Sequence, residues 1–225
     1  MKPMNPFRRM FRLLFFRIDK ADILNFNNRD LQLGLLVTWI AGMGRYWDDP
    51  NASAIQHTGV GSILYVFILA FFIWNLLLPW KIENWNYWNL LTFISFTSLP
   101  AILYATPVEK FFDISTSSVI NAYFLLIVAV WRVALLVFYL IRFARLSIFQ
   151  TIIATFLPLA AIVTGLTFLN LSRGVIQIMG GFREPTSNDT VYRIVTDLTI
   201  LSFNFVIPLF VCYLFIVYRR FKSST

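Results

Sequence analysis

The sequence has very few of the residues from which catalytic and metal sites are usually built. It contains one cysteine, Cys212, and one histidine, His57, among 225 residues. A single cysteine cannot form an intrachain disulfide or a cysteine-based zinc site, and one histidine excludes a histidine-rich site. Charged residues are also scarce, at 13%, against roughly 25% in an ordinary soluble domain. A disulfide framework and a cysteine-based or histidine-rich metal site are therefore excluded, and the low charge indicates an integral membrane protein.

The sequence patterns of intramembrane and phosphate-handling enzymes are missing as well. There is no His-Glu-x-x-His sequence, no glycine-rich phosphate loop, and no helix-borne histidine to serve an intramembrane serine nucleophile. No Asp or Glu lies deep within an apolar stretch, although proton- and ion-coupled carriers usually place ionisable groups in the bilayer. We therefore expect a non-enzymatic protein that has no cofactor, no metal and no proton relay.

The residues that are abundant are those of a membrane protein. The chain is 58% hydrophobic and 18% aromatic, with a mean hydropathy of +0.70. Six apolar stretches predict transmembrane helices, most of them near the roughly 20 residues that a span needs, at about 31–47, 62–80, 88–106, 118–141, 149–171 and 197–218. The first stretch is short and contains glycine, so a re-entrant segment is its alternative. The expected fold is an all-α polytopic transmembrane bundle.

The distribution of Lys and Arg predicts the orientation of this bundle. If the N-terminus is cytoplasmic, 13 of the 19 basic residues lie on the inner side, five lie on the outer side, and Arg132 lies within a span. Cytoplasmic loops carry the excess of positive charge in membrane proteins. The pattern therefore favours six spans with both termini in the cytoplasm.

The basic residues also divide the chain into three parts. Residues 1–30 form a basic, amphipathic N-terminal segment, 31–218 the transmembrane domain and 219–225 a basic tail. We expect the N-terminal segment either to lie on the inner leaflet as an interfacial helix or to act only as a topology anchor. The net charge of +8 indicates contact with anionic lipid headgroups rather than with nucleic acid, because the basic residues flank apolar spans.

One arginine lies near the middle of an apolar run. Arg132 is ten residues before Arg142, which places it about 15 Å from the inner edge. Its side chain should lean outward, since helical side chains point toward the N-terminus of their helix. Asn204 and the carbonyl groups freed by Pro158 and Pro208 are the acceptors expected there, so Arg132 is predicted to clamp the last three spans. The candidate intramembrane polar cluster consists of Arg132, Asn204, Asn75 and Asn121.

A second group of polar residues lies at the expected outer face. The stretch GMGRYWDDPNA contains Arg45, Asp48 and Asp49, and Glu109 is on the same side. These residues form a candidate outer-face site that recognises a ligand or headgroup. The alternative is a polar cap that ends the first span, with Tyr and Trp in the aromatic belt.

The stretches TWIAGMGRYWDDP, YATPVEKFF and VWRVALL resemble a family of bacterial inner-membrane proteins with no assigned activity. The resemblance covers most of the chain and implies an integral protein of the bacterial inner membrane, without implying any functional residue. Two functions remain open. One is a scaffold or accessory subunit bound to a partner membrane protein. The other is a small-molecule or lipid transporter or channel whose path is lined by Arg132.

Overall fold

The computed structural model describes residues 4–47, 54–169 and 190–222, and within these ranges the chain is helical and contains no strand. The elements in chain order are α1 (Pro6–Leu14), α2 (Lys20–Leu24), α3 (Asn28–Gly44), α4 (Ala54–His57), α5 (Val60–Leu77), η1 (Leu78–Trp80), α6 (Tyr87–Phe96), η2 (Leu99–Ala105), η3 (Val108–Lys110), α7 (Ile114–Arg142), α8 (Ile148–Phe168) and α10 (Thr190–Lys222). The all-α expectation is confirmed. The basic tail expected from residue 219 begins instead as the last turn of α10.

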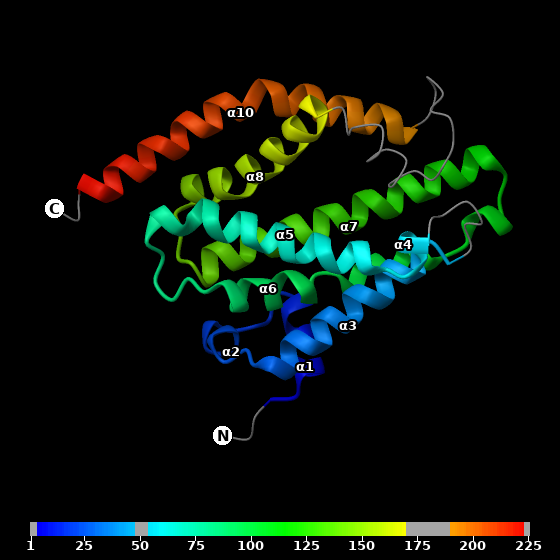
Figure 1. The fold of residues 1–225 in the computed structure, drawn as a ribbon, viewed down its shortest axis with the longest axis horizontal. Coiled ribbons are helices and arrows are strands. Elements are labelled where there is room, and N and C mark those ends of the chain that lie inside the picture. The colour runs from blue at the N-terminus through cyan, green and yellow to red at the C-terminus, as the bar shows by residue number, and fades with distance from the viewer. Residues whose placement is uncertain (1–3, 48–53, 170–189, 223–225) are drawn as a thin grey trace.

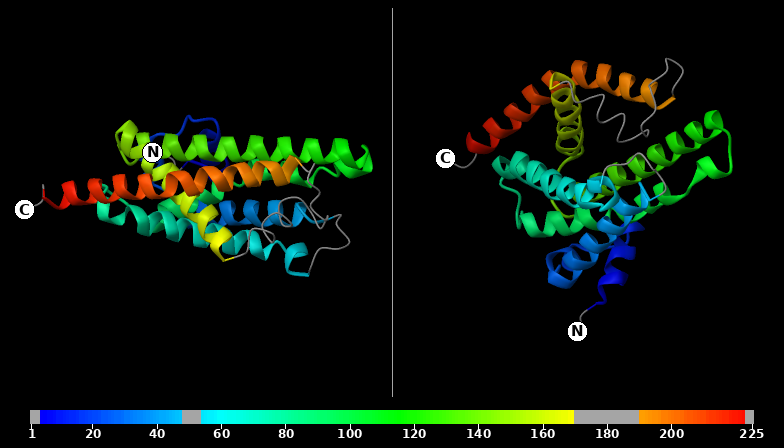
Figure 2. Two further views of the ribbon diagram at one scale, coloured as in Figure 1. Left: turned by 90° about the horizontal axis from the view of Figure 1, so that it is seen from above. Right: turned by 45° about the vertical axis from the view of Figure 1, so that its right-hand side comes forward.

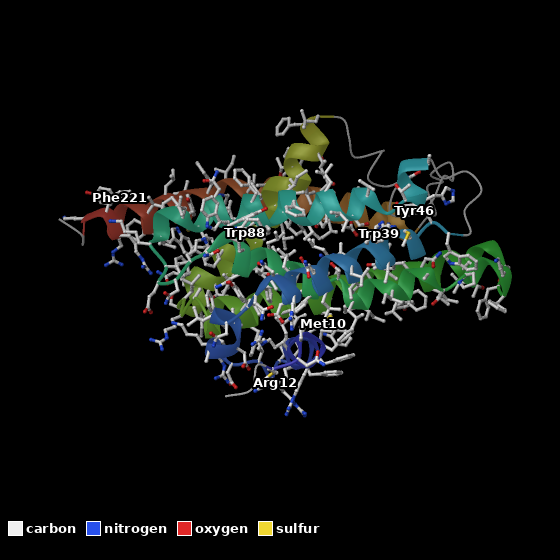
Figure 3. The ribbon with its side chains drawn as sticks, turned by 60° about the horizontal axis from the view of Figure 1, so that its bottom comes forward. Met10, Arg12, Trp39, Tyr46, Trp88 and Phe221 are labelled. Carbon is white, nitrogen blue, oxygen red and sulfur yellow. The ribbon has the colours of Figure 1, made fainter. Side chains whose placement is uncertain are left out.

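The long helices alternate in direction along the molecule (Figure 1). Five segments are long and apolar enough to cross a membrane: 60–80, 87–105, 119–142, 148–168 and 196–222. The remaining long helix, α3, has 17 residues, about 26 Å at 1.5 Å per residue. Trp39 and Tyr46 lie toward one end of the molecule and Phe221 at the other (Figure 3). We call the end that contains Phe221 the basic end, because Arg142, Arg219 and Lys222 are also at this end of their helices.

Side-chain caps explain where several helices begin. Asn27 and Asp30 form a reciprocal capping box at the start of α3, and Ser147 and Gln150 form another at the start of α8. Each box satisfies two backbone N–H groups that lack a partner within the helix. Pairs of this kind are readable in the sequence, and they define the helix starts near the basic end.

Small residues allow α3 to approach its neighbours closely. A Cβ atom placed on Gly34 would lie 2.6 Å from the Cβ of Ser95 on α6, and one on Gly42 would lie 2.5 Å from the hydroxyl of Ser62 on α5. Close approach of this kind is how helices pack in membranes, where lipid offers no hydrophobic drive for association. The contact makes α3 an integral part of the bundle.

The last two long helices pack against each other on one side of the molecule (Figures 1 and 2). Buried and partly buried residues of α10 recur with a seven-residue period: Ser202, Val206, Leu209, Tyr213 and Ile216. Tyr213 donates a 2.6 Å hydrogen bond to the carbonyl of Leu76 and stacks on Trp80. The α8–α10 pair is therefore fastened to α5 near the basic end, while only 11% of the apolar section of α10 is buried.

The N-terminal helix is docked on the bundle. Arg9 is buried and forms an ion pair with Asp30, whose side chain is completely buried. Met10 faces the bundle (Figure 3), and the Trp131 indole donates a 3.0 Å hydrogen bond to the carbonyl of Leu14. The expected amphipathic helix exists, but its arginines are not all on a headgroup-facing side. Arg9 points inward because a carboxylate at the start of α3 is available to pair with it.

Candidate functional site

Arg132 lies on α7 and reaches the third apolar segment rather than the last one. Its Nε donates a hydrogen bond to Thr97 Oγ1 at 3.4 Å, and its Cζ lies 6.0 Å from the ring centroid of Tyr65 on α5. Thr97 is ten residues after Tyr87, as Arg132 is ten residues before Arg142. Both residues are therefore about 15 Å from the basic end at 1.5 Å per residue.

Thr97 accepts this bond because the chain changes conformation there. α6 ends at Phe96, and the next turns form the 3₁₀ helix η2, with Pro100 near its start. Proline has no N–H to continue the α-helical hydrogen bonds, and it disfavours the α conformation in the residue before it. The Thr97 hydroxyl donates to the carbonyl of Ile94 at 2.7 Å, which leaves its oxygen lone pairs available to the guanidinium.

The structure does not bring Arg132 and Asn204 together. Asn204 is exposed and donates to the carbonyl of Ile200 in its own helix at 2.8 Å. Two residues along an α-helix correspond to a rotation of about 200°, so Asn204 lies on the opposite side of α10 from the buried Ser202. The clamp predicted between the last three spans is replaced by a contact of Arg132 with the α6–η2 junction and α5.

The other two members of the predicted polar cluster lie elsewhere. Asn75 is exposed near the basic end of α5, and Asn121 is partly buried in the first half of α7. Counted along α7, Asn121 is 11 residues from Arg132, about 16 Å at the α-helical rise. The four residues of the cluster therefore do not line one shared space.

Arg45 follows the last residue of α3 and packs among aromatic rings. Its Cζ lies 5.5 Å from the ring centroid of Tyr46 and 5.3 Å from that of Tyr104 on η2. Asp48 and Asp49 lie outside the described residues, as does the side chain of Glu109. The predicted outer-face site is therefore represented in the structure by Arg45 alone.

Further aromatic contacts hold the end of α3 against η2. The Trp47 indole donates a 2.9 Å hydrogen bond to the carbonyl of Ala105, and the Lys110 ammonium lies 4.5 Å from the Trp47 ring centroid. A Cβ placed on Gly44 would lie 2.9 Å from the Cβ of Ala105. These contacts fix the position of Arg45 relative to Tyr104.

Tyr104 connects the two arginines. Arg45, Arg132 and Tyr65 each lie close enough to its phenol to interact with it electrostatically. Sequence reasoning selected Arg45 and Arg132 as members of two separate groups, and it missed Thr97, Tyr65 and Tyr104. Pro100 lies two residues after the polar stretch 97–98, and Pro107 directly follows the stretch 104–106. These prolines mark a break in the third span, and this is the signal that indicates polar groups facing inward there.

Several ion pairs of the described residues lie within the N-terminal segment or join it to α3 and to the loop before α6. They include Arg9–Asp30, Arg12–Asp19, Arg12–Asp22 and Lys20–Glu83. Arg45 and Arg132 form no ion pair with any described carboxylate, and their contacts are aromatic rings and one hydroxyl. In the described ranges no three His, Cys, Asp or Glu residues are grouped as a metal site requires. The described groups around Arg45 and Arg132 are therefore aromatic rings and a hydroxyl.

Comparison of the chain with protein-family models, with curated proteins and with solved structures gives no match in any of the three.

Proposed function

We propose that the chain is a non-enzymatic protein of the bacterial inner membrane that serves as a scaffold or accessory subunit of a membrane complex. In this proposal it crosses the bilayer six times and has both termini in the cytoplasm. The excess of Lys and Arg at one end supports the orientation. α3 supplies the sixth span, since its length of about 26 Å is close to the roughly 30 Å hydrocarbon core and small mismatches are accommodated by local thinning.

The basic end supports contact with anionic headgroups of the inner leaflet. Arg142 and Arg219 are exposed in the last turns of α7 and α10 at this end. Each basic side chain near an anionic membrane surface contributes about 1 kcal/mol to binding. Exposed Phe7 and Phe11 (55% and 47%) on α1 add apolar surface that enters the acyl boundary, as in interfacial helices.

The observation that carries the subunit proposal is the exposure of Asn204. Its amide lies near the middle of α10, and only 11% of the apolar section of this helix is buried. Its carbonyl is also left without the usual helical donor, because Pro208 is four residues later. A polar side chain and a freed carbonyl facing hydrocarbon are costly, and across a helix–helix contact such groups supply hydrogen bonds. A transmembrane helix of a partner protein satisfies both groups.

The transport alternative has less support. A carrier path requires polar groups that converge on one space, whereas Asn75 and Asn204 lie on exposed faces of different helices and Asn121 lies about three turns from Arg132. Arg132 itself is directed at Thr97 and Tyr65. This distribution favours a structural role for the described polar groups.

The subunit proposal is tested by extraction in mild detergent and identification of co-purifying membrane proteins. We expect a stable partner with the wild-type chain and a large loss of that partner with Asn204→Leu. Asn75→Leu is the matched control, because it also removes an exposed asparagine but lies near the basic end, where water satisfies the amide. Equal recovery of the partner from both variants, or a purified species of this chain alone, would refute the proposal.

A further inference from the structure

We propose that Arg45 and Arg132, together with Tyr65 and Tyr104, form a binding site for the phosphate of an anionic membrane lipid. The site lies in the half of the bundle opposite the basic end. It does not rest on the subunit role, because none of its residues is on α10. Failure of the co-purification experiment would therefore leave it untouched.

Unused hydrogen-bond donors are the first argument for a ligand. A guanidinium has five N–H donors, and Arg132 uses one of them, for Thr97. Arg45 makes no hydrogen bond to any described residue, and its guanidinium is held between Tyr46 and Tyr104. The phenol hydroxyls of Tyr65 and Tyr104 also lack hydrogen bonds within the part of the chain that the structure describes. These groups together offer donors in excess, which is the chemistry that a phosphate requires.

Repulsion between two positive charges is the second argument. Arg45 lies against Tyr104 and Arg132 lies against Tyr65, and both arginines interact with the Tyr104 phenol, so their like charges repel each other. A cation–π contact stabilises a cation by less than a central arginine costs in a membrane helix. A phosphate between the two guanidinium groups removes the repulsion and satisfies the donors at once.

Depth and exposure identify the ligand as a lipid rather than a soluble anion. The Cα of Arg45 is about 25 Å from the basic end along α3, and that of Arg132 about 15 Å along α7. The part of the bundle between the depths of Arg45 and Arg132 therefore begins at the boundary of the hydrocarbon core and extends toward its middle. Tyr65 is 49% exposed, and its neighbours Leu64 and Ile68 are 58% and 57% exposed. A molecule that approaches Arg132 past Tyr65 comes from the bilayer, and its acyl chains lie along these apolar side chains.

Lys110 extends the positive surface to the outside. Its ammonium lies over the Trp47 ring, and the Trp47 indole donates a hydrogen bond to the carbonyl of Ala105, the residue after Tyr104. Trp and Tyr at this level match the aromatic belt at the membrane–water interface. An anionic headgroup at the interface is thus attracted by Lys110 and Arg45 before it meets Arg132.

The test is lipid retention by the full chain reconstituted in nanodiscs. One set of discs contains phosphatidylcholine alone and the other an equal mixture of phosphatidylcholine and phosphatidylglycerol. After release into mild detergent, native mass spectrometry counts the phosphatidylglycerol molecules that remain bound. We expect specific retention by the wild type and a fall of about tenfold or more in Arg45→Gln and in Arg132→Gln, because each removes charge-assisted bonds to the phosphate.

Matched variants separate binding from folding and from general surface charge. Arg142→Gln removes one exposed arginine from the headgroup contact at the basic end, and it should lower retention far less than Arg45→Gln does, because the charge-assisted bonds in the proposed site remain. Tyr65→Phe keeps the exposed ring and removes only the hydroxyl, so it should fold normally and still weaken lipid retention. It therefore tests the site even if Arg132→Gln fails to fold. Elution of each variant as a single species in size-exclusion chromatography reports folding.

Three results would overturn the proposal. They are the absence of retained phosphatidylglycerol in the wild type, undiminished retention in Arg45→Gln or Tyr65→Phe, and equal loss in Arg142→Gln. A further arm adds inorganic phosphate to discs of phosphatidylcholine alone and measures thermal stability. Stabilisation as large as that given by phosphatidylglycerol, dependent on Arg45, would show that the site takes the free anion and would refute the lipid as its ligand.

Discussion

Removal of the charge on Asp30 should release the N-terminal helix from the bundle. The Asp30 carboxylate is completely buried and is shared between Arg9 and the backbone N–H of Asn27. Asp30→Asn keeps an oxygen that can accept the Asn27 bond but leaves the Arg9 guanidinium buried without an anion. Breaking a buried ion pair by removing one partner costs about 3–5 kcal/mol.

The Arg9–Asp30 ion pair should supply the largest part of the free energy that holds α1 on the bundle, because α1 is surrounded by membrane lipid. Met10, Leu13 and Leu14 are buried between α1 and the bundle, but on release these side chains enter lipid rather than water. Their transfer therefore costs little, in contrast to the exposure of core side chains in a soluble protein. The Arg9–Asp30 pair and the bond from the Trp131 indole to Leu14 are the contacts that lipid cannot replace.

Hydrogen exchange of α1 in nanodiscs measures the effect. A loss of 3 kcal/mol in local opening corresponds to amide exchange more than about 100-fold faster in Pro6–Leu14. The double variant Arg9→Met with Asp30→Asn removes both charges and should recover most of the protection, since replacement of a whole buried pair is often nearly neutral. Unchanged protection in Asp30→Asn, or equally weak protection in the double variant, would refute the reasoning.

Two further predictions concern packing and a single hydrogen bond. Gly34→Ala should lower the free energy of unfolding of the chain in detergent by about 1–3 kcal/mol, because its Cβ would overlap that of Ser95. Gly165→Ala is the matched helical control and should be neutral or stabilising by up to about 1 kcal/mol, since no atom lies within 4 Å of the new Cβ; the same loss in both variants would contradict the packing argument. Trp131→Phe should increase hydrogen exchange of α1 about fivefold, equivalent to the roughly 1 kcal/mol of its bond to Leu14, and an unchanged rate would show that this bond does not hold the helix.

The helices of this chain follow from one-dimensional signals. Apolar stretches predict the five segments that are long enough to span, together with α3, because a span needs about 20 apolar residues and backbone groups must be satisfied within the segment. The observed starts of α3 and α8 directly follow their capping residues, Asn27 and Ser147. Three differences remain. The α-helix of the third span ends at Phe96 and a 3₁₀ helix follows it, and α10 begins at Thr190 instead of residue 197. At the C-terminus, α10 continues through Lys222 instead of ending at residue 218. Basic side chains are favourable in the last turn of a helix, so positive charge there extends the helix.

The partners of polar residues do not follow from such signals. Counting residues places Arg132 and Thr97 at the same depth in the membrane, but by the same count the Arg132 side chain could also reach Asn204. Depth alone therefore does not identify the hydrogen-bond acceptor of Arg132. What distinguishes these acceptors is the rotation of each helix about its axis, and that rotation is fixed by packing between helices. On α10 the buried period through Ser202 and Tyr213 turns Asn204 outward. Sequence periodicity is weak in a span whose lipid-facing and protein-facing residues are both apolar, so the rotation is poorly encoded.

The surroundings of Arg9 differ from those of Arg45 and Arg132, and this difference determines what each arginine can bind. Arg9 faces a carboxylate that is part of a helix cap, so its charge is already neutralised and its position is fixed by two elements. Arg45 and Arg132 face rings and a hydroxyl, which attract a cation without neutralising it. A paired arginine gains little from a new anion, whereas one held over a ring retains most of its charge and its N–H donors. Anion binding is therefore expected where the arginines contact aromatic side chains.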